Sequence, residues 1–332
     1  MSTVAVIGPH LVDVLGRPVS EIPPGQGSIV LDEIRVTVAG TGGGAAVDLA
    51  KLGISVSSFG AIGDDVLGRL LITQLQEHGV DTAGLVTRRG EKTAATILPI
   101  RPNGERPALH VPGTMASLQA ADVDGTALLG ADAVLFGGPE TAPALMNSDG
   151  IALLDAVHAA GVPIFVDLLY PGGPETLELL TPLLPLVDWF LPNDQQLRGL
   201  TGVDDLDVAA RILLDRGVGA VAVTVGEQGA LLLRPDVEPV SVPALPTTVV
   251  DTTGCGDSFN AGMITGLLSG CTPEDAALIG SACGALVASG LGSDAGIVDL
   301  AGVLARIVDF NPEAGRRIDG VVATRTIVAL DA

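Results

Sequence analysis

Short apolar segments alternate with longer amphipathic segments along most of this 332-residue chain, and this alternation is the strongest constraint on its fold. The longer segments, such as residues 65–77, place leucines on one helical face. Strands that alternate with helices predict a mostly parallel sheet with helices on both faces, which is an α/β fold. The expected strands are residues 4–7, 56–60, 133–136, 164–166, 189–191, 220–225, 229–233 and 247–250, with a final strand at residues 321–330.

Two segments break this alternation. Residues 10–38 combine a proline-rich stretch with the alternating run LDEIRVTV, and residues 93–111 read as two strands joined by an Asn103-Gly104 turn. Alternation of apolar and polar residues is typical of strands that are covered on one face only. We predict that both segments form a small antiparallel sheet projecting from the main domain, as a lid or a dimer contact. Because no linker or charge run divides the chain, we expect residues 1–332 to form a single domain.

The chain is strongly acidic, with a formal net charge of −22 at pH 7. This charge argues against binding to nucleic acid or to an anionic membrane surface. No apolar run approaches the ~18 residues of a membrane span, and the N-terminus lacks the pattern of a secretory signal. The three cysteines form no CxxC pair. We therefore expect a cytoplasmic protein. Any phosphate site in it must rely on backbone amides, Mg²⁺ and arginines, because the only lysines, Lys51 and Lys92, lie outside phosphate motifs.

The segment DTTGCGDSF, residues 251–259, carries the clearest chemical signal. It leads into a helical run at residues 258–268, and Gly254 and Gly256 allow its backbone N–H groups to crowd together. The start of a helix exposes unpaired donors and the positive end of the helix dipole, which favour an anion such as phosphate. Asp257 follows directly and is placed to take a proton from a group beside that anion. The alternative is an ordinary turn whose aspartate only stabilises the helix start.

A second glycine-rich segment, AGTGGGAAVDLAKLG at residues 39–53, has two interpretations. Gly40 and Gly42 fit the weak form of a dinucleotide-binding fingerprint, but no acidic residue ends the next strand before Asp64 to hold a ribose. We favour the second interpretation, in which the glycines let a polyhydroxylated substrate approach the backbone. Asp13 follows the first strand, where α/β sheets place their ligands. It either accepts hydrogen bonds from two sugar hydroxyls or is a solvated loop residue.

Taken together, these segments resemble the PfkB family of carbohydrate kinases, also called ribokinase-like, over roughly residues 4–300. The run GAIGDDVLGRLLITQLQEHGVDT at residues 60–82 is similar to the second half of the family's N-terminal signature. The run DTTGCGDSFNAGMITGL at residues 251–267 is similar to its C-terminal signature. The resemblance implies a three-layer α/β/α domain with a small β-sheet lid over the acceptor site. It also implies ATP and Mg²⁺ as cofactors, and K⁺ as a further ion.

The resemblance implies roles for individual residues as well. Asp257 would be the general base for the acceptor hydroxyl, and the amides of Gly254, Cys255 and Gly256 would form the anion hole for the transferring phosphoryl group. The other implied residues are Asp13, Gly40, Gly42 and Gly44 for the acceptor, Asn193, Thr224, Gly226, Gly229 and Gly256 for ATP, Asn193 and Gln196 for the Mg²⁺ network, and Asp251 and Thr253 for a monovalent cation.

The chain departs from the family pattern at four places. Gln196 replaces the glutamate of an N-x-x-E motif, which removes a charge from the Mg²⁺ network unless Asp194 compensates. Gly44 stands where many sugar-binding members carry asparagine, and Cys255 replaces a commoner alanine. The segment that begins at Asp167 lacks the family's usual Asp-Pro-Asn-x-Arg motif. None of these changes removes the base or the phosphate turn.

We predict an ATP-dependent kinase that transfers the γ-phosphoryl group to a hydroxyl of a small sugar or sugar acid. Two alternatives stay open at this point. One is an adenosine-type nucleoside kinase of the same fold, although no base-stacking platform is obvious. The other is a nucleotide- or sugar-binding protein with weakened catalysis, which Gln196 favours. The expected partners are a sugar-type acceptor and ATP, with the lid as a homodimer interface.

Overall fold

The computed structural model describes the backbone of residues 2–330 and the side chains as far as residue 324. Its centre is a nine-stranded sheet with the order β13-β12-β11-β10-β9-β8-β1-β4-β5. The strands from β11 to β5 run parallel, and β12 and β13 are added antiparallel at one edge. The strand bounds are β1 Thr3–Ile7, β4 Ser55–Gly63, β5 Asp81–Arg88, β8 Ala133–Gly137, β9 Ile164–Asp167, β10 Trp189–Phe190, β11 Ala220–Thr224, β12 Ala230–Arg234 and β13 Val237–Val242.

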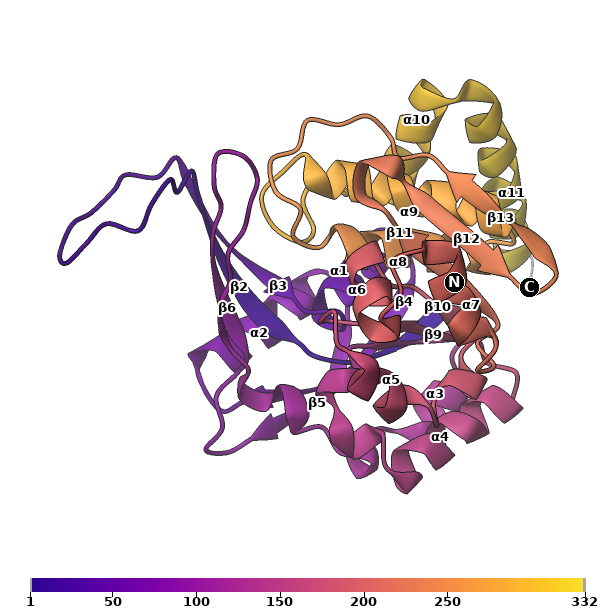
Figure 1. The fold of residues 1–332 in the computed structure, drawn as a ribbon, viewed down its shortest axis with the longest axis horizontal. Helices are drawn as coiled ribbons and strands as arrows, with labels where there is room; N and C mark the ends of the chain where they lie inside the picture. Colours follow the sequence, from indigo (N-terminus) through magenta and orange to yellow (C-terminus); the bar gives the residue numbers. More distant parts are fainter. Residues whose placement is uncertain (1, 331–332) are drawn as a thin grey trace.

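Helices cover both faces of this sheet (Figure 1). In β1, Val4 and Val6 pack into one apolar cluster, while Ala5 and Ile7 pack into another on the opposite face. A parallel strand buried on both faces needs such a continuous apolar run. The first side holds α1 Gly43–Lys51, α2 Val66–Glu77, α8 Cys255–Leu268, α9 Pro273–Ala288, α10 Leu300–Phe310 and α11 Pro312–Leu330; the second holds α3 Gly125–Leu129, α4 Ser148–Ala159, α5 Pro174–Leu180, α6 Asp194–Thr201 and α7 Leu206–Leu214. The predicted α/β fold is confirmed.

A second sheet, called the small sheet below, stands to one side of the main body (Figure 1). Its order is β3-β2-β6-β7, and its strands lie within residues 11–39 and 95–111, one residue beyond the expected segments 10–38 and 93–111. However, β2 and β6 pair in parallel, so the expectation of a wholly antiparallel sheet was wrong. Both strands follow parallel strands of the main sheet, β1 and β5, and therefore leave it in the same direction. The bounds are β2 Leu11–Arg17, β3 Glu33–Ala39, β6 Ala95–Pro99 and β7 Leu109–Val111.

The register of the small sheet separates a polar side from an apolar side. Residues paired directly across neighbouring strands point to the same face of a sheet. Asp13 is paired with Thr96, and Thr96 with His110, so these polar residues share one side. The next pair along, Ile97 and Leu109, therefore points to the opposite side, where both side chains are exposed.

Residues 247–250 were expected to be a strand and are not. The Thr247 hydroxyl donates a hydrogen bond to the Ala285 carbonyl, and the Val250 amide donates to the Ala288 carbonyl. The last carbonyls of a helix have no partner inside it. The segment therefore pairs with the end of α9 instead of with a sheet edge.

The expected final strand at residues 321–330 is also wrong, because these residues continue α11. Asn311 caps the start of this helix by accepting from the Ala314 amide at 3.1 Å, and Ile318 is fully buried on the first side. Packing of this kind overrides the strand preference of a β-branched run. Among the described residues, no helix is both long enough and apolar enough to cross a membrane.

Candidate active site

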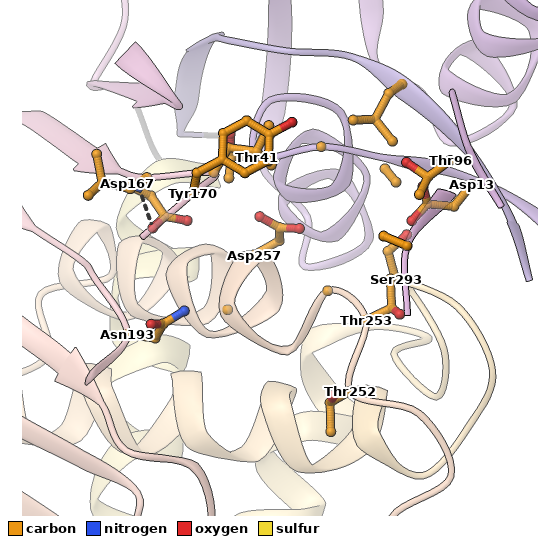
Figure 2. Close-up of a pocket in the computed structure, with 18 of the residues that line it drawn as sticks. Asp13, Thr41, Thr96, Asp167, Tyr170, Asn193, Thr252, Thr253, Asp257 and Ser293 are labelled. Carbon is orange, nitrogen blue, oxygen red and sulfur yellow. Dashed lines mark hydrogen bonds between the residues drawn. The ribbon is translucent and has the colours of Figure 1, made fainter. Parts of the chain in front are cut away.

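A cavity of about 280 Å³ lies between the main domain and the small sheet. It sits near the carboxyl ends of the parallel strands, where open α/β sheets bind their ligands. Figure 2 shows its polar side chains converging from several elements. The polar side chains that line the cavity are Asp13, Thr96, Arg106 and His110 from the small sheet and its β6–β7 loop, Thr41 beside α1, and Asp167, Tyr170, Asn193, Gln196, Thr224, Thr252, Thr253, Asp257 and Ser293 from the rest of the main domain.

The turn that leads into α8 borders this cavity. Gly254 has a left-handed backbone with a φ of 79°, and a Cβ there would lie 2.5 Å from the backbone of Ser293, so only glycine fits. Gly256 also lines the cavity, and a Cβ at this position would meet no atom within 4 Å. Since the first amides of a helix have no partner inside it, the turn offers donors beside open space.

Asp251 holds the turn in this shape. Its Oδ1 accepts hydrogen bonds from the amide and the hydroxyl of Thr253, at 3.0 and 2.8 Å, and its Oδ2 accepts from the Gly292 amide at 3.0 Å. Cys255 points away, and its thiol donates to the Gly284 carbonyl at 3.6 Å. Burial raises the pKa of the Cys255 thiol to about 12, which leaves it protonated and a poor nucleophile.

Asp257 lies in the first turn of α8, with its carboxyl group between Asp167 and Asp13 (Figure 2). Burial and, second to it, the charge of Asp13 raise the pKa of Asp257 to about 7, and the Arg106 guanidinium opposes them. A carboxyl group with a pKa near neutrality is suited to general acid–base chemistry. Gly44 leaves room for it, because a Cβ there would lie 2.9 Å from Asp257 Oδ2.

The residues expected to hold the acceptor occupy two positions. Asp13 and Gly40 line the cavity directly. Burial raises the pKa of Asp13 to about 6, against the opposing effects of the neighbouring Thr96 hydroxyl and the Arg106 charge. Gly42 and Gly44 lie behind this wall, and a Cβ at Gly42 would come within 2.9 Å of neighbouring backbone. Both glycines are therefore required for close packing.

The residues expected to contact ATP meet at the opposite side of the cavity. Asn193 begins α6 and forms a β-bridge with Thr224 at the end of β11, and both line the cavity. Gln196 is buried, with Oε1 accepting from the Asn193 amide at 2.7 Å and Nε2 donating to the Leu168 carbonyl at 2.6 Å. A glutamate would place an oxygen against that carbonyl, so the glutamine suits its surroundings.

Three neighbouring residues lie outside the cavity wall. Asp194 forms an ion pair with Arg198 along α6, so its charge is already balanced. Gly226 and Gly229 occupy the tight turn between β11 and β12. Gly229 has a φ of 93°, and a Cβ there would lie 2.1 Å from the Val242 carbonyl oxygen at the end of β13, so backbone conformation and packing explain the glycine.

Three further cavity residues carry little or no local sequence signal. Asp167 accepts a hydrogen bond from the Asn260 amide group at 2.8 Å, and burial together with the charge of Asp257 raises its pKa well above the usual range. Its one signal is a carboxylate at the end of a strand. Arg106 and Tyr170 come from irregular loops, where only the tertiary fold brings them to the site.

Comparison with known proteins agrees with this geometry. A family model described as pfkB family carbohydrate kinase matches residues 1–299. The deoxyribokinase of Salmonella typhi is 28% identical over 265 residues, which cover 77% of this chain and 82% of that protein. The 2-dehydro-3-deoxygluconokinase of Bacillus subtilis is 27% identical over 258 residues, covering 75% and 80%. A structure of a putative ribokinase II from E. coli, in complex with ATP and Mg²⁺, has a TM-score of 0.79 at 24% identity and covers 93% of this chain and 100% of that one.

The fold and the cavity thus define a carbohydrate kinase, a phosphotransferase with an alcohol group as acceptor. The match spans most of the sequence, so this chain belongs to the pfkB family of carbohydrate kinases. The predicted resemblance is confirmed, and so is the ribokinase-like fold.

Proposed function

We propose that this enzyme transfers the γ-phosphoryl group of ATP to a hydroxyl of a small sugar or sugar acid, with Asp257 as the general base. One observation carries the proposal: a buried carboxyl group whose pKa is about 7 lies beside the open amides of Gly254 and Gly256. In the transfer, the acceptor hydroxyl gives its proton to Asp257 as its oxygen bonds to the γ-phosphorus. The bond from that phosphorus to the β–γ bridging oxygen breaks, and ADP leaves.

The charge balance of the cavity supports ATP with Mg²⁺ as the donor. Asp13, Asp167 and Asp257 line it, whereas Arg106 is the only arginine or lysine among the described lining residues. The charge of Asp257 raises the pKa of Asp167, so a divalent cation near Asp167 and Asn193 would relieve this repulsion. When bound, Mg²⁺ neutralises charge on the β- and γ-phosphates. The described side chains form no cluster of three metal ligands, which fits an ion that arrives with the nucleotide.

The proposal extends to a monovalent cation and to the small sheet. Asp251 and Thr253 stay our candidates for a K⁺ site, next to the loop that contains Gly292.

We also propose that the small sheet is the lid over the acceptor, since Asp13, Thr96 and His110 on its polar side line the cavity. A closed lid would exclude water and limit ATP hydrolysis.

The test is ADP release, followed with a coupled assay over a panel of neutral sugars, sugar acids and nucleosides. We expect turnover with a sugar or a sugar acid. Turnover with adenosine alone would favour the nucleoside kinase, while ATP binding without any turnover would favour a binding protein. If ATP binds but no acceptor is phosphorylated, the proposal is contradicted.

Arg106 favours a sugar acid within this class. Its Nε donates to the Thr252 hydroxyl at 3.2 Å, and its charge lowers the pKa of both Asp13 and Asp257, so the guanidinium lies near the acceptor end. Charge-assisted hydrogen bonds to a carboxylate are strong. We expect Arg106→Gln to lower kcat/KM for a sugar acid by about 10- to 100-fold, and Arg106→Lys by less. The kcat/KM for the matching neutral sugar should change little. Equal losses of kcat/KM for both substrates would indicate that Arg106 contacts the phosphoryl group instead.

The rate should depend on pH through Asp257. Its pKa of about 7 means that the base is protonated in acid, so kcat should rise as the pH increases from about 6 to 8. The charge of Asp13 contributes to this raised pKa. In Asp13→Asn, measured at saturating acceptor, the midpoint of the rise should therefore shift to lower pH. A flat profile between pH 6 and 8 would remove Asp257 as the titrating base.

We further propose a homodimer through the apolar side of the small sheet. Ile34, Ile97 and Leu109 are 67%, 55% and 58% exposed there. Contiguous exposed apolar side chains of this kind mark interaction surfaces. Light scattering should give a dimer for the natural protein and a monomer for Ile97→Lys. Val208→Lys, at an exposed apolar residue on α7, serves as the control and should stay dimeric. A monomeric natural protein would contradict the proposal.

A further inference from the structure

The loop at residues 291–294 contacts the turn that leads into α8. The Gly292 amide donates a hydrogen bond to Asp251 Oδ2 at 3.0 Å. The backbone of Ser293 lies so close to Gly254 that a Cβ on this glycine would be 2.5 Å from it. The Ser293 side chain lines the cavity, as Figure 2 shows. The loop therefore supports the turn that holds the phosphoryl group in the proposed function.

On its other side, the same loop contacts β3 of the small sheet. The Ser293 hydroxyl donates a hydrogen bond to the Val38 carbonyl. Gly292 has a φ of 96°, and a Cβ there would lie 2.8 Å from the Thr37 side chain. Thr37 in turn is paired with Asp13 across β3 and β2. The loop thus connects the phosphate turn to the pair of strands that carries Asp13.

Two cations bind this loop through Asp294. Its Oδ1 accepts a hydrogen bond from Arg35 Nη2 at 2.9 Å, and its Oδ2 accepts from Lys51 Nζ at 2.6 Å. Each cation also holds the loop backbone, because Arg35 Nη1 donates to the Leu291 carbonyl at 2.7 Å and Lys51 Nζ donates to the Asp294 carbonyl at 2.9 Å. Arg35 belongs to β3, and Lys51, one of only two lysines in the chain, ends α1. Asp294 therefore ties the loop to the small sheet and to the main domain.

The Asp294 carboxylate is charged although it is largely buried. Its side chain is 9% exposed and that of Lys51 is 15% exposed. Burial disfavours the charge, but Lys51 and Arg35 outweigh this effect and lower the pKa of Asp294. Removal of one partner of such a pair leaves the other charge buried and uncompensated. Neutralising Asp294 should therefore release both cations from the loop.

We propose that Asp294 is a positioning residue for phosphoryl transfer, which holds residues 291–294 against β3 and against the turn before α8 at the same time. The acceptor wall and the phosphate turn then keep the spacing that the reaction needs. A misplacement of about 1 Å in such an arrangement can cost about 100-fold in rate. The effect on the rate rests on the proposed function, whereas the link between the two segments rests on the contacts of Asp294 alone.

The first test is amide hydrogen exchange of the ligand-free protein, followed by mass spectrometry, and it needs no substrate. Asp294→Asn should speed exchange both in β3 and in residues 251–256, because both segments lose the same support. Asp275→Asn is the matched control, since Asp275 is a buried carboxylate that pairs with Arg317 between α9 and α11 and does not line the cavity. It should leave exchange in both segments unchanged. Faster exchange in only one segment of Asp294→Asn, or in neither, overturns the proposal.

The second test is kinetic and uses ATP with the best acceptor of the panel. Asp294→Asn should lower kcat and kcat/KM for ATP together, by about 10- to 100-fold, with a nearly unchanged KM for ATP. This combination indicates an interaction that matters in the transition state and not in ATP binding. Asp275→Asn should keep its kcat, although it too loses a buried ion pair. A loss of stability alone therefore cannot produce the expected result.

Arg35 provides a variant that folds even if Asp294→Asn does not, because the Arg35 side chain is 37% exposed. Arg35→Gln should lower kcat in the same way but by less, and Arg35→Lys should recover part of the loss because it keeps the charge. An unchanged kcat in both Asp294→Asn and Arg35→Gln would overturn the positioning role. If the natural protein phosphorylates no acceptor, the proposed function fails, while the exchange experiment still decides whether Asp294 links the two segments.

Discussion

Asp257→Asn should lower kcat by at least about 100-fold, the low end of a general-base contribution. The amide has the same shape as the carboxyl group but cannot take the proton of the acceptor hydroxyl. Steady-state rates at saturating ATP and acceptor measure the effect, and ATP affinity should persist. Asp155→Asn, the same change on an exposed turn of α4, is the matched control and should keep full activity.

The same variant should not lose stability. Asp257 has a folded-state pKa of about 7, above its value in the unfolded chain, so its contribution to stability is present in acid and is lost as the pH rises through 7. Asparagine is uncharged at every pH and avoids this loss. The Tm of Asp257→Asn relative to the natural protein should therefore be higher at pH 8 than at pH 5. Near-normal turnover of Asp257→Asn would show that Asp257 is not the general base. Unfolding of this variant would show that Asp257 has a structural role.

Gly256→Ala should lower kcat/KM by about 100-fold or more with a nearly unchanged Tm. A Cβ at Gly256 would meet no atom within 4 Å, so the protein can accept the methyl group. That open space borders the amides that we assign to the transferring phosphoryl group, and loss of one such donor typically costs 10²- to 10³-fold in kcat. The assay uses ATP with the best acceptor, and thermal melting is followed in parallel.

Two further glycine variants distinguish a steric effect on folding from a loss of phosphoryl binding. Gly320→Ala, at an equally open position inside α11, should leave the rate unchanged and should raise the Tm slightly, because alanine favours a helix over glycine. Gly254→Ala should lower the Tm, because its φ is positive and its Cβ would lie 2.5 Å from the Ser293 backbone. If Gly256→Ala were fully active, the space beside it could not be where the phosphoryl group lies.

The main sheet was predictable because its strands are apolar on both faces. Val4 to Ile7 form a continuous run that only a doubly covered strand can bury, and the intervening segments keep a helical period. Residues 321–330 were missed because local preference for a strand yields to a helix that has already begun at Pro312. The parallel pairing of β2 and β6 depends on how the chain leaves the main sheet, which no local pattern records.

Of the candidate site, the sequence predicts the turn at residues 254–257 but not the residues that distant loops contribute. Gly254, Gly256 and Asp257 are adjacent in sequence, so one turn and one helix start define their relation. Arg106 and Tyr170 are brought to the cavity by loops that lie far apart in the chain, and nothing in their neighbours marks them. Even at Gln196, the sequence indicates a lost charge, but only the contact of its amide with the Leu168 carbonyl explains why glutamine fits there.

A crystal structure with a non-hydrolysable ATP analogue and Mg²⁺ tests the central claim most directly. Our account predicts that the terminal phosphate accepts hydrogen bonds from the backbone amides of Gly254, Cys255 and Gly256, with the Asp257 carboxyl group next to the space for the acceptor hydroxyl. A terminal phosphate bound elsewhere, out of reach of these amides, would contradict it.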